Sequence, residues 1–345
     1  MPFNCFRQLT HLSIQNCSIT LKGRDAKREI NFGPECLEEL ELSSLEYHDF
    51  EQPIIYFKKL SNLKKLLLHV NFLSKIDIVS FMEILNLEDL ELSVNKYDLR
   101  KKNIFENFSK LKKLAIRGFS NVDERHFRNF PHLEFLYTLC CEYTDSIENT
   151  FSKLNKLTSL NLSNNKLENL DSNIFNHLNN LETLTIRYNP IKKLNSNLFK
   201  SFLKLEKIDL SHCSITCIHV NAFQGLFSLK RLNLKGNKLV DIKEETFKDV
   251  KGLQSLNLNK NPLKKLESNL FRGLIKLKTL RLRDCMLSEI NGSTFEDLIE
   301  CEALDLSNNR IEVINTGAFD HMKNLKYLNL SKLKDLNKTM NFTEV

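Results

Sequence analysis

Phenylalanine recurs along this chain at a fixed interval, and that interval limits the folds that the chain can adopt. From Phe151 to Phe319, each member of the series follows the previous one by 24 residues (175 − 151 = 24, and so on). Earlier members of the series are Phe3, Phe57, Phe81, Phe105 and Phe127. A constant period of this size predicts a stack of similar units, each of which covers the apolar face of its neighbour.

Each unit follows the pattern L-x-x-L-x-L-x-x-N-x-L-x-x-L-x-x-x-x-F-x-x-L-x-x, which is cleanest in the unit that begins at Leu157. The alternation of apolar and polar residues in L-x-x-L-x-L predicts a short strand with one buried face. Neighbouring strands should pair into a parallel sheet, and the phenylalanine should close the opposite wall. Fourteen units, the last incomplete, begin at Leu9, Leu37, Leu63, Leu87, Leu111, Leu133, Leu157, Leu181, Leu205, Leu229, Leu253, Leu277, Cys301 and Leu325.

Asparagine follows many of the predicted strands, where the chain should turn toward the interior. These residues are Asn71, Asn95, Asn165, Asn189, Asn237, Asn261 and Asn309. A buried amide can bond backbone groups of adjacent turns that would otherwise lack partners. Cysteine takes the same position at Cys17, Cys141, Cys213 and Cys285. Because cysteine is small and tolerates burial, we expect these four thiols in the core.

These residues resemble the leucine-rich-repeat family, in particular the 24-residue, phenylalanine-containing subtype of Toll-like receptor ectodomains and Slit-like adhesion proteins. The resemblance implies an α/β repeat solenoid, a horseshoe with a parallel β-sheet on its concave face. We expect residues 1–345 to form a single solenoid of about 14 repeats with both ends uncapped. We also expect a fragment, because Phe3 and Phe6 match the tail of an earlier unit and neither end carries a cysteine cap.

The composition is 41% hydrophobic and 27% charged, which is typical of a folded, soluble chain. No apolar run reaches the roughly 18 residues that a membrane span requires. No secretory leader precedes the first unit in this sequence. We therefore expect an extracellular or cell-surface protein whose membrane attachment and leader, if it has them, lie in a missing segment.

The sequence lacks the motifs of common catalytic and cofactor sites, including G-x-x-x-x-G-K-[ST], G-x-G-x-x-G, H-E-x-x-H and G-x-S-x-G. It also lacks the C-x-x-C pairs of structural zinc sites. His212 and His219 flank Cys213 and Cys217, which suggests a metal site, but Cys213 is already explained by the asparagine series. We expect no enzymatic activity, no cofactor and no bound metal.

Strand side chains that point away from the core should form the concave face. The candidate ligand-binding residues there are Phe135, Tyr137, Leu139, Arg187, Tyr188, Lys207, Arg231, Lys235, Arg281 and Arg283. The first three form an apolar group, which is typical of a binding patch; alternatively, an irregular repeat turns them inward. The cations suit an acidic partner; alternatively, they are solvated and offset by Asp209, Asp284 and Asp305.

Seven N-x-S/T sequences are candidate glycosylation sites, at Asn16, Asn107, Asn161, Asn291, Asn329, Asn337 and Asn341. They are compatible with secretion. Asparagine, serine and threonine are all common in this chain, so several of these sequences are expected by chance.

The repeat pattern and the side chains of the face predict molecular recognition. The resemblance implies the ectodomain of a Toll-like receptor that binds a protein or an acidic ligand through the concave or lateral face. It also implies pairing of two solenoids as a homo- or heterodimer. The net charge is only +7 over 345 residues, which does not favour nucleic acid. Two alternatives remain open: an extracellular adhesion or matrix protein without signalling, and an intracellular scaffold or inhibitor with free thiols.

Overall fold

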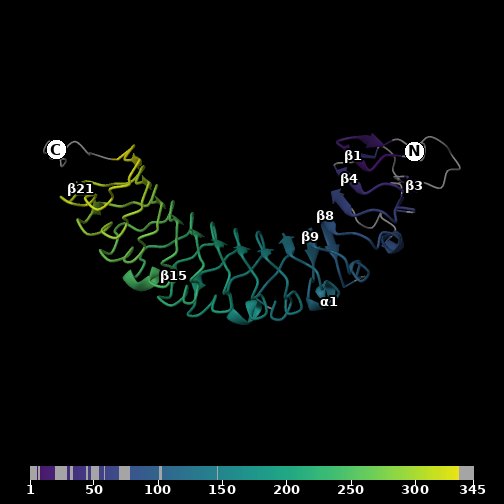
Figure 1. Cartoon of the computed structure of the whole chain (residues 1–345), viewed down its shortest axis with the longest axis horizontal. Coiled ribbons are helices and arrows are strands. Elements are labelled where there is room, and N and C mark those ends of the chain that lie inside the picture. The colour runs from purple at the N-terminus through teal and green to yellow at the C-terminus, as the bar shows by residue number, and fades with distance from the viewer. Residues whose placement is uncertain are drawn as a thin grey trace. The chain divides into compact units, whose positions relative to one another are not determined.

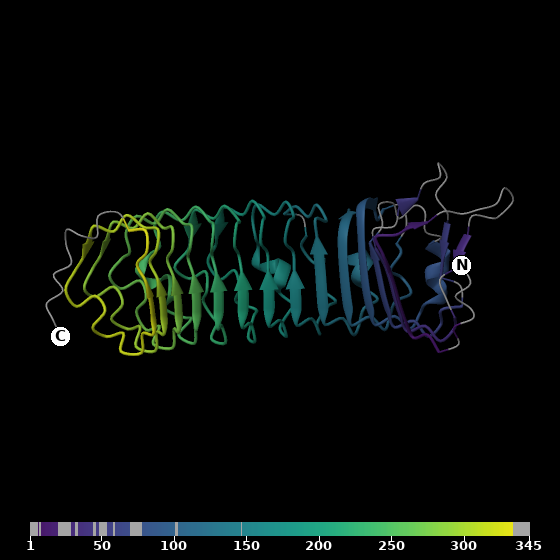
Figure 2. The same ribbon diagram turned by 90° about the horizontal axis from the view of Figure 1, so that it is seen from above.

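The computed structural model of the protein describes residue 6 and residues 8–19, 29–31, 34–43, 46–47, 54–57, 59–69, 78–100, 103–145 and 147–333. The chain divides into two compact units, which comprise residues 1–161 and 162–345. Within each unit, parallel strands stand side by side and short turns run along the opposite side (Figures 1 and 2). We describe each unit by itself.

The first unit contains seven parallel strands in chain order. They are β1 (His11–Gln15), β4 (Glu39–Ser43), β7 (Lys65–His69), β8 (Asp89–Asp98), β9 (Lys113–Ser120), β10 (Phe135–Leu139) and β11 (Ser159–Asn161). Two small parallel pairs accompany them, β2 (Ser18–Ile19) with β5 (Glu46–Tyr47) and β3 (Glu29–Asn31) with β6 (Ile54–Tyr56). The described helical segments of this unit are the 3-10 segment η3 (Ile78–Glu83) and the four-residue helix α1 (Glu124–Phe127).

The second unit also contains seven parallel strands in chain order. They are β12 (Thr183–Thr185), β14 (Lys207–Asp209), β16 (Arg231–Asn233), β17 (Ser255–Asn257), β18 (Thr279–Arg281), β20 (Ala303–Asp305) and β22 (Tyr327–Asn329). Shorter pairs lie beyond them, β13 (Lys193–Leu194) with β15 (Cys217–Ile218) and β19 (Glu289–Ile290) with β21 (Val313–Ile314). The described helical segments are the 3-10 turns η4 (Ser172–Phe175) and η5 (Glu244–Phe247).

The register of the strands follows the sequence period. Ile208 of β14 pairs with Leu232 of β16, and Leu232 pairs with Leu256 of β17. All three side chains are buried, whereas the residues on either side of them are exposed or half-buried. The predicted parallel repeat solenoid with one buried strand face is therefore confirmed, and it contains very little helix.

The phenylalanine series packs as predicted. In the second unit, the rings of Phe199, Phe223 and Phe247 stack with centroids 6.1 Å apart at each step and interplanar angles of 8° and 16°. Phe271 and Phe295 continue the same geometry at 6.1 Å. These rings are almost fully buried. Each buries apolar area that one repeat could not cover alone, a contribution of roughly 1.5–3 kcal/mol per side chain.

The asparagine series connects neighbouring repeats through the backbone. The Nδ2 of Asn237 donates to the carbonyl oxygens of Leu210 and Leu234, both at 2.9 Å. Its Oδ1 accepts from the amides of Cys213 and Ile215, both at 3.0 Å. One buried amide thus satisfies four backbone groups, three of them in the preceding repeat. Asn165, Asn189, Asn261 and Asn309 are buried in the same way, whereas Asn71 lies outside the described residues.

Three of the four cysteines predicted for this series are buried. The Sγ of Cys213 donates to the carbonyl oxygen of Ile186 at 3.1 Å, and that of Cys285 donates to Leu258 at 3.2 Å. Burial raises the pKa of Cys213 to about 11 and that of Cys141 to about 12. The prediction was wrong for Cys17, which is exposed because it belongs to the first described repeat and no earlier described strand covers it.

The prediction was also wrong for Asn95, which is exposed. Strands β8 and β9 continue past the usual turn, with a shift in their pairing between Ser93 and Tyr97. Asn95 therefore lies in a strand extension and not at an inward turn. Gly118 permits the extension, because its φ is +79° and a Cβ there would stand 1.9 Å from the carbonyl oxygen of Val94.

Two phenylalanines of one repeat offer a matched test of the ring stack. Phe223 is buried, whereas Phe227 is 74% exposed. We expect Phe223→Ala to lower the free energy of unfolding by about 3–5 kcal/mol through lost burial and a new cavity. Phe227→Ala should change it by no more than about 0.5 kcal/mol. Urea unfolding followed by circular dichroism measures both, and equal losses would contradict this description of the stack.

Substitutions at Asn237 test the amide connection. We expect Asn237→Ala to cost about 2–4 kcal/mol, because several buried backbone groups lose this partner. Asn237→Cys should cost less, because a thiol can still donate to a carbonyl, as Cys213 and Cys285 do. Asn237→Cys should still lower the free energy of unfolding, because the thiol does not replace the amide oxygen as an acceptor. Urea unfolding measures the free energies of unfolding of the two variants. An Asn237→Cys protein as unstable as Asn237→Ala would contradict the expected order.

Candidate ligand-binding face

The apolar candidates of the first unit lie on one strand. Phe135, Tyr137 and Leu139 alternate along β10 with the buried residues Leu136 and Thr138. Phe135 is 37% exposed, and the other two are half-buried. Their side chains therefore stand on the open face of the sheet, and the alternative that this strand turns them inward does not hold.

Charged side chains on the open face of the first unit are arranged in ion pairs. Glu39 of β4 lies between His11 at 3.1 Å and Lys65 at 3.5 Å. Lys113 pairs with Asp89 at 3.3 Å, and the ring of His69 lies 3.0 Å from Glu91. Opposite charges on adjacent strands stabilise a sheet by a fraction of a kcal/mol per pair. On this part of the face, Lys65 and Lys113 are thus paired with acidic side chains of adjacent strands.

The predicted cations of the second unit also lie on its open face, and all of them except Arg187 form no ion pair with the described residues. Within residues 162–333, six strand-face cations form no ion pair: Lys207, Arg231, Lys235, Lys260, Arg281 and Arg283. We call this group the cationic face. All six are exposed or half-buried. Two acidic residues lie on the same face of the sheet, Asp209 in β14 and Asp305 in β20 opposite Arg281, and each uses one carboxylate oxygen to cap an amide, that of Ser211 or Ser307.

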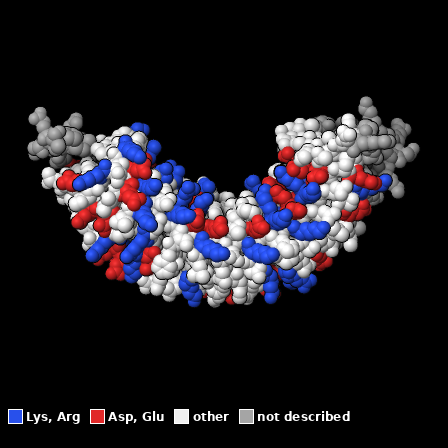
Figure 3. Space-filling view, viewed as in Figure 1, with Lys and Arg blue, Asp and Glu red and all other residues white. Residues whose placement is uncertain are grey.

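The turns at the edge of the sheet carry ion pairs. Lys230 pairs with Glu206, and Lys326 pairs with Glu302 at 2.8 Å. The hydrogen bond from Lys230 holds the pKa of Glu206 below its ordinary value. Basic and acidic groups are intermixed on the side of the molecule drawn in Figure 3. Some lysines of the turns thus form ion pairs, whereas others there, such as Lys200 and Lys276, form none with the described residues.

An aromatic stack adjoins the cationic face. The rings of Tyr188 and His212 are parallel within 10°, with centroids 4.9 Å apart. The guanidinium of Arg187 lies over the Tyr188 ring at 5.2 Å and its Nε is 3.8 Å from Asp209. Gly236, with a φ of +69°, leaves room for the histidine, because a Cβ there would stand 2.5 Å from its Nδ1.

The sequence prediction included Arg187 and Tyr188 in the site but not this stack. Tyr188, His212 and Gly236 occupy the same position in three successive repeats. That spacing was the available signal, since equal positions in successive repeats become neighbours across the sheet.

The environment of His212 disfavours its protonated form. Burial lowers its pKa below the ordinary value, and the charges of Lys235, Arg187 and Lys260 lower it further, while Asp209 opposes them. A neutral ring at pH 7 is compatible with the stack. Because the pKa is lower in the folded protein, this residue favours folding above its ordinary pKa and the contribution is lost as the pH falls.

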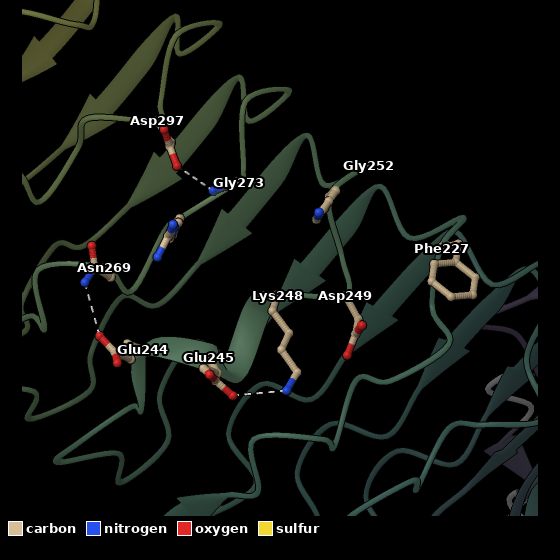
Figure 4. A pocket seen from close by; sticks show the side chains of 11 residues that line it. Phe227, Glu244, Glu245, Lys248, Asp249, Gly252, Asn269, Gly273 and Asp297 are labelled. Carbon is tan, nitrogen blue, oxygen red and sulfur yellow. Dashed lines mark hydrogen bonds and ion pairs between the residues drawn. The ribbon is translucent and has the colours of Figure 1, made fainter.

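A groove that the sequence did not predict lies in the turns of the second unit (Figure 4). Its volume is about 710 Å³, and Gly252 and Gly273 supply no side chains to fill it. Several polar groups that line it already have partners: Glu245 pairs with Lys248 at 3.1 Å, and the amide of Gly273 donates to Asp297 at 2.7 Å. The groove lies apart from the strand face.

The candidate glycosylation sites differ in exposure. Asn16 and Asn107 are exposed, whereas Asn161, Asn291 and Asn329 are half-buried. Asn161 and Asn329 lie in β11 and β22, on the open faces of their units. Asn337 and Asn341 lie outside the described residues.

Among the described residues, no group of three or more histidine, cysteine, aspartate or glutamate side chains is placed to hold a metal ion. No helix among the same residues is both long and apolar enough to cross a bilayer.

A stack of parallel strands with a buried leucine face and one open side-chain face defines a leucine-rich-repeat solenoid. The family model described as BspA type Leucine rich repeat region matches residues 53–147 and 216–343. A second model, Leucine rich repeat, matches residues 138–191 and 179–239. These matches span more than half of the sequence, so the chain belongs to the leucine-rich-repeat family. No curated protein sequence matches the chain.

Solved structures resemble the chain at low sequence identity. Toll, in the Toll–Spatzle complex of Drosophila, has a TM-score of 0.76 and 21% identity, covering 93% of this chain and 46% of the Toll chain. An internalin from Listeria monocytogenes has a TM-score of 0.65 and 19% identity, covering 93% of this chain and 86% of the internalin. TLR13, solved with ssRNA13, has a TM-score of 0.59 and 22% identity, covering 90% of this chain and 47% of TLR13.

At these identities the likeness concerns the fold alone. The chain spans less than half the length of the Toll and TLR13 chains that it matches. The fold and the family thus identify a leucine-rich-repeat protein of the kind that recognises other molecules.

The surroundings of His212 generate a pH prediction. We expect its pKa, measured by NMR titration of the ring protons, to lie below the ordinary value of 6.5. Lys235→Gln should raise it, because one of the charges that disfavour the imidazolium is removed. Lys200→Gln, which removes a cation from an exposed turn, should leave it unchanged. Equal shifts in the two variants would show that the local field of the cationic face is not the cause.

Proposed function

We propose that this chain is the recognition part of an extracellular leucine-rich-repeat receptor of the Toll-like kind. In this proposal, an acidic ligand binds to the cationic face, and the protein has no catalytic role. The observation that carries the proposal is the clustering of six cations without ion pairs on one face, whereas Lys65 and Lys113 on the open face of the first unit are paired. Unneutralised cations on one face attract anionic partners and accelerate their association.

The apolar residues of β10 support a second contact, with a protein partner. Phe135 and Tyr137 expose ring surface beside Lys113 and Ala115 of β9. Aromatic side chains of this kind often supply the binding energy of protein interfaces. Toll is solved in complex with Spatzle and TLR13 with ssRNA13, so related solenoids are known with ligands of both kinds. Pairing of two solenoids belongs to the same proposal.

An intracellular scaffold is the second candidate, because seven described cysteines are free thiols: Cys17, Cys36, Cys140, Cys213, Cys217, Cys285 and Cys301. N-glycans separate the two candidates. Asn107 is exposed and followed by Phe108 and Ser109, so a secreted protein should carry a glycan there that peptide N-glycosidase removes. Native protein without any such glycan would favour the scaffold. An adhesion or matrix protein without signalling would share both the glycan and the cationic face.

Charge reversal tests the proposed binding face. We expect the full chain to bind at least one polyanion among a heparin octasaccharide, a 20-nucleotide oligonucleotide, poly-glutamate and anionic vesicles. Lys207→Glu with Arg231→Glu should weaken that binding by about tenfold or more, equivalent to about 1.4 kcal/mol. Biolayer interferometry at physiological ionic strength measures the dissociation constants.

The matched control is Lys200→Glu with Lys276→Glu, which changes the net charge equally at exposed turn positions. The control should alter binding by less than about threefold, because charges beyond one Debye length are largely screened. If the two double variants lose binding equally, or if no probe depends on the cationic face, the proposed function fails.

A further inference from the structure

We infer that the ligand of the cationic face is a sulfated polysaccharide. This inference rests on the proposed function and names the chemical class of its ligand. Four observations support it: the repulsion between Lys207 and Arg231, the length of the array of cations, the hydrogen-bond donors between them, and the lack of an aromatic ring or apolar centre between the cations of β14 to β18 among the described residues.

Two cations of adjacent strands, Lys207 and Arg231, are placed where they repel each other, whereas Arg281 lies opposite Asp305. Lys207 and Arg231 occupy directly opposite positions in the register of β14 and β16. Like charges in such positions destabilise a sheet. The same position in the first unit carries Glu39, Lys65 and Asp89 on successive strands, with opposite charges facing each other. An anion that bridges Lys207 and Arg231 would remove the repulsion.

The cations form an extended array. They run from Lys207 in β14 to Arg281 and Arg283 at β18, across four consecutive strands. Strands are spaced about 4.8 Å apart, so these three steps span roughly 14 Å, and Arg187 on the preceding repeat adds one more step. A single small anion would reach only two of these groups. A chain with anionic groups at regular intervals could contact most of them at once.

The neutral side chains between the cations also present donors. The Oδ1 atoms of Asn233, Asn257 and Asn259 accept from the backbone amides of Lys235, Asn259 and Arg283, at 3.1, 3.1 and 2.8 Å. Their Nδ2 groups have no acceptor among the described residues. The amide oxygens are therefore occupied and the amide donors are available. Such a surface matches a ligand that consists almost entirely of acceptors, such as sulfate and ring oxygens.

Single-stranded nucleic acid fits this face less well. Proteins bind it by combining cations with aromatic side chains on which the bases stack. Two exposed rings lie near the cationic face. Tyr188 already contacts His212 at 4.9 Å and Arg187 at 5.2 Å, and Tyr327 stands in β22, two strands beyond β18. No free ring platform lies among Lys207, Arg231, Lys235 and Lys260 in the described structure.

An acidic protein also fits this face less well. Protein interfaces usually have an apolar centre surrounded by polar groups. The large exposed apolar residues Leu203, Phe227 and Ile275 lie in turns before the strands. Between the cations, the strands present Asn233, Ser255 and Asn257 instead. A sulfated polysaccharide requires neither stacking nor an apolar centre.

The test compares probes on the full chain. We expect a sulfated heparin octasaccharide to bind at least tenfold more tightly than its desulfated counterpart, poly-glutamate or a 20-nucleotide oligonucleotide, single- or double-stranded. Lys207→Glu with Arg231→Glu should weaken octasaccharide binding at least tenfold, and Lys200→Glu with Lys276→Glu less than threefold. Asn257→Asp, which replaces a donor with an anion, should weaken it about threefold or more. Unchanged melting temperatures and circular dichroism establish that the variants are folded.

The outcomes separate the two proposals. If an oligonucleotide or poly-glutamate binds most tightly and its binding depends on Lys207 and Arg231, the polysaccharide is wrong and the acidic-ligand function stands. If no probe depends on Lys207 and Arg231, both proposals are wrong. If the octasaccharide binds but the turn variants reduce its affinity as much as the face variants, binding follows net charge alone and the polysaccharide site is overturned.

Discussion

Every repeat of this protein has an apolar face that it cannot cover by itself, and the rest of the structure follows from that constraint. The leucine positions pair in register, and the phenylalanine rings stack at 6.1 Å through successive repeats of the second unit. The buried asparagines link each repeat to the one before it. Asn237, for example, forms hydrogen bonds with three backbone groups of the preceding repeat. Backbone groups at each turn thus find partners that a single repeat lacks.

Alternate residues of each strand point into the core. The residues between them are therefore not constrained by core packing. The two units use that freedom differently. On the first, Glu39 forms an ion pair with Lys65 and lies 3.1 Å from the ring of His11. On the second, the cations of the cationic face have no such partners among the described residues, and three asparagines present their amide donors beside them. The two open faces thus differ in how their charges are arranged on a similar strand backbone.

Much of the fold could be predicted from the sequence, because a fixed period determines which residues become neighbours. The strands, the ring stack and the buried positions of Cys213 and Cys285 followed from it. The exposed position of Asn95 did not follow from the period. The shift in strand pairing between β8 and β9 depends on the close backbone approach that Gly118 allows. The candidate cations were named correctly as face residues, but their lack of ion pairs and the Tyr188–His212 stack depend on side-chain directions that periodicity does not specify.

The central claim is that a sulfated chain lies across the cationic face, and lysine protection tests it most directly. The full chain would be acetylated with a lysine reagent, with and without a heparin octasaccharide, and the modified lysines quantified by mass spectrometry. We predict protection of Lys207, Lys235 and Lys260, and none of Lys200 and Lys276, which lie in exposed turns. Equal protection of both groups, or protection of the turn lysines alone, would contradict the claim.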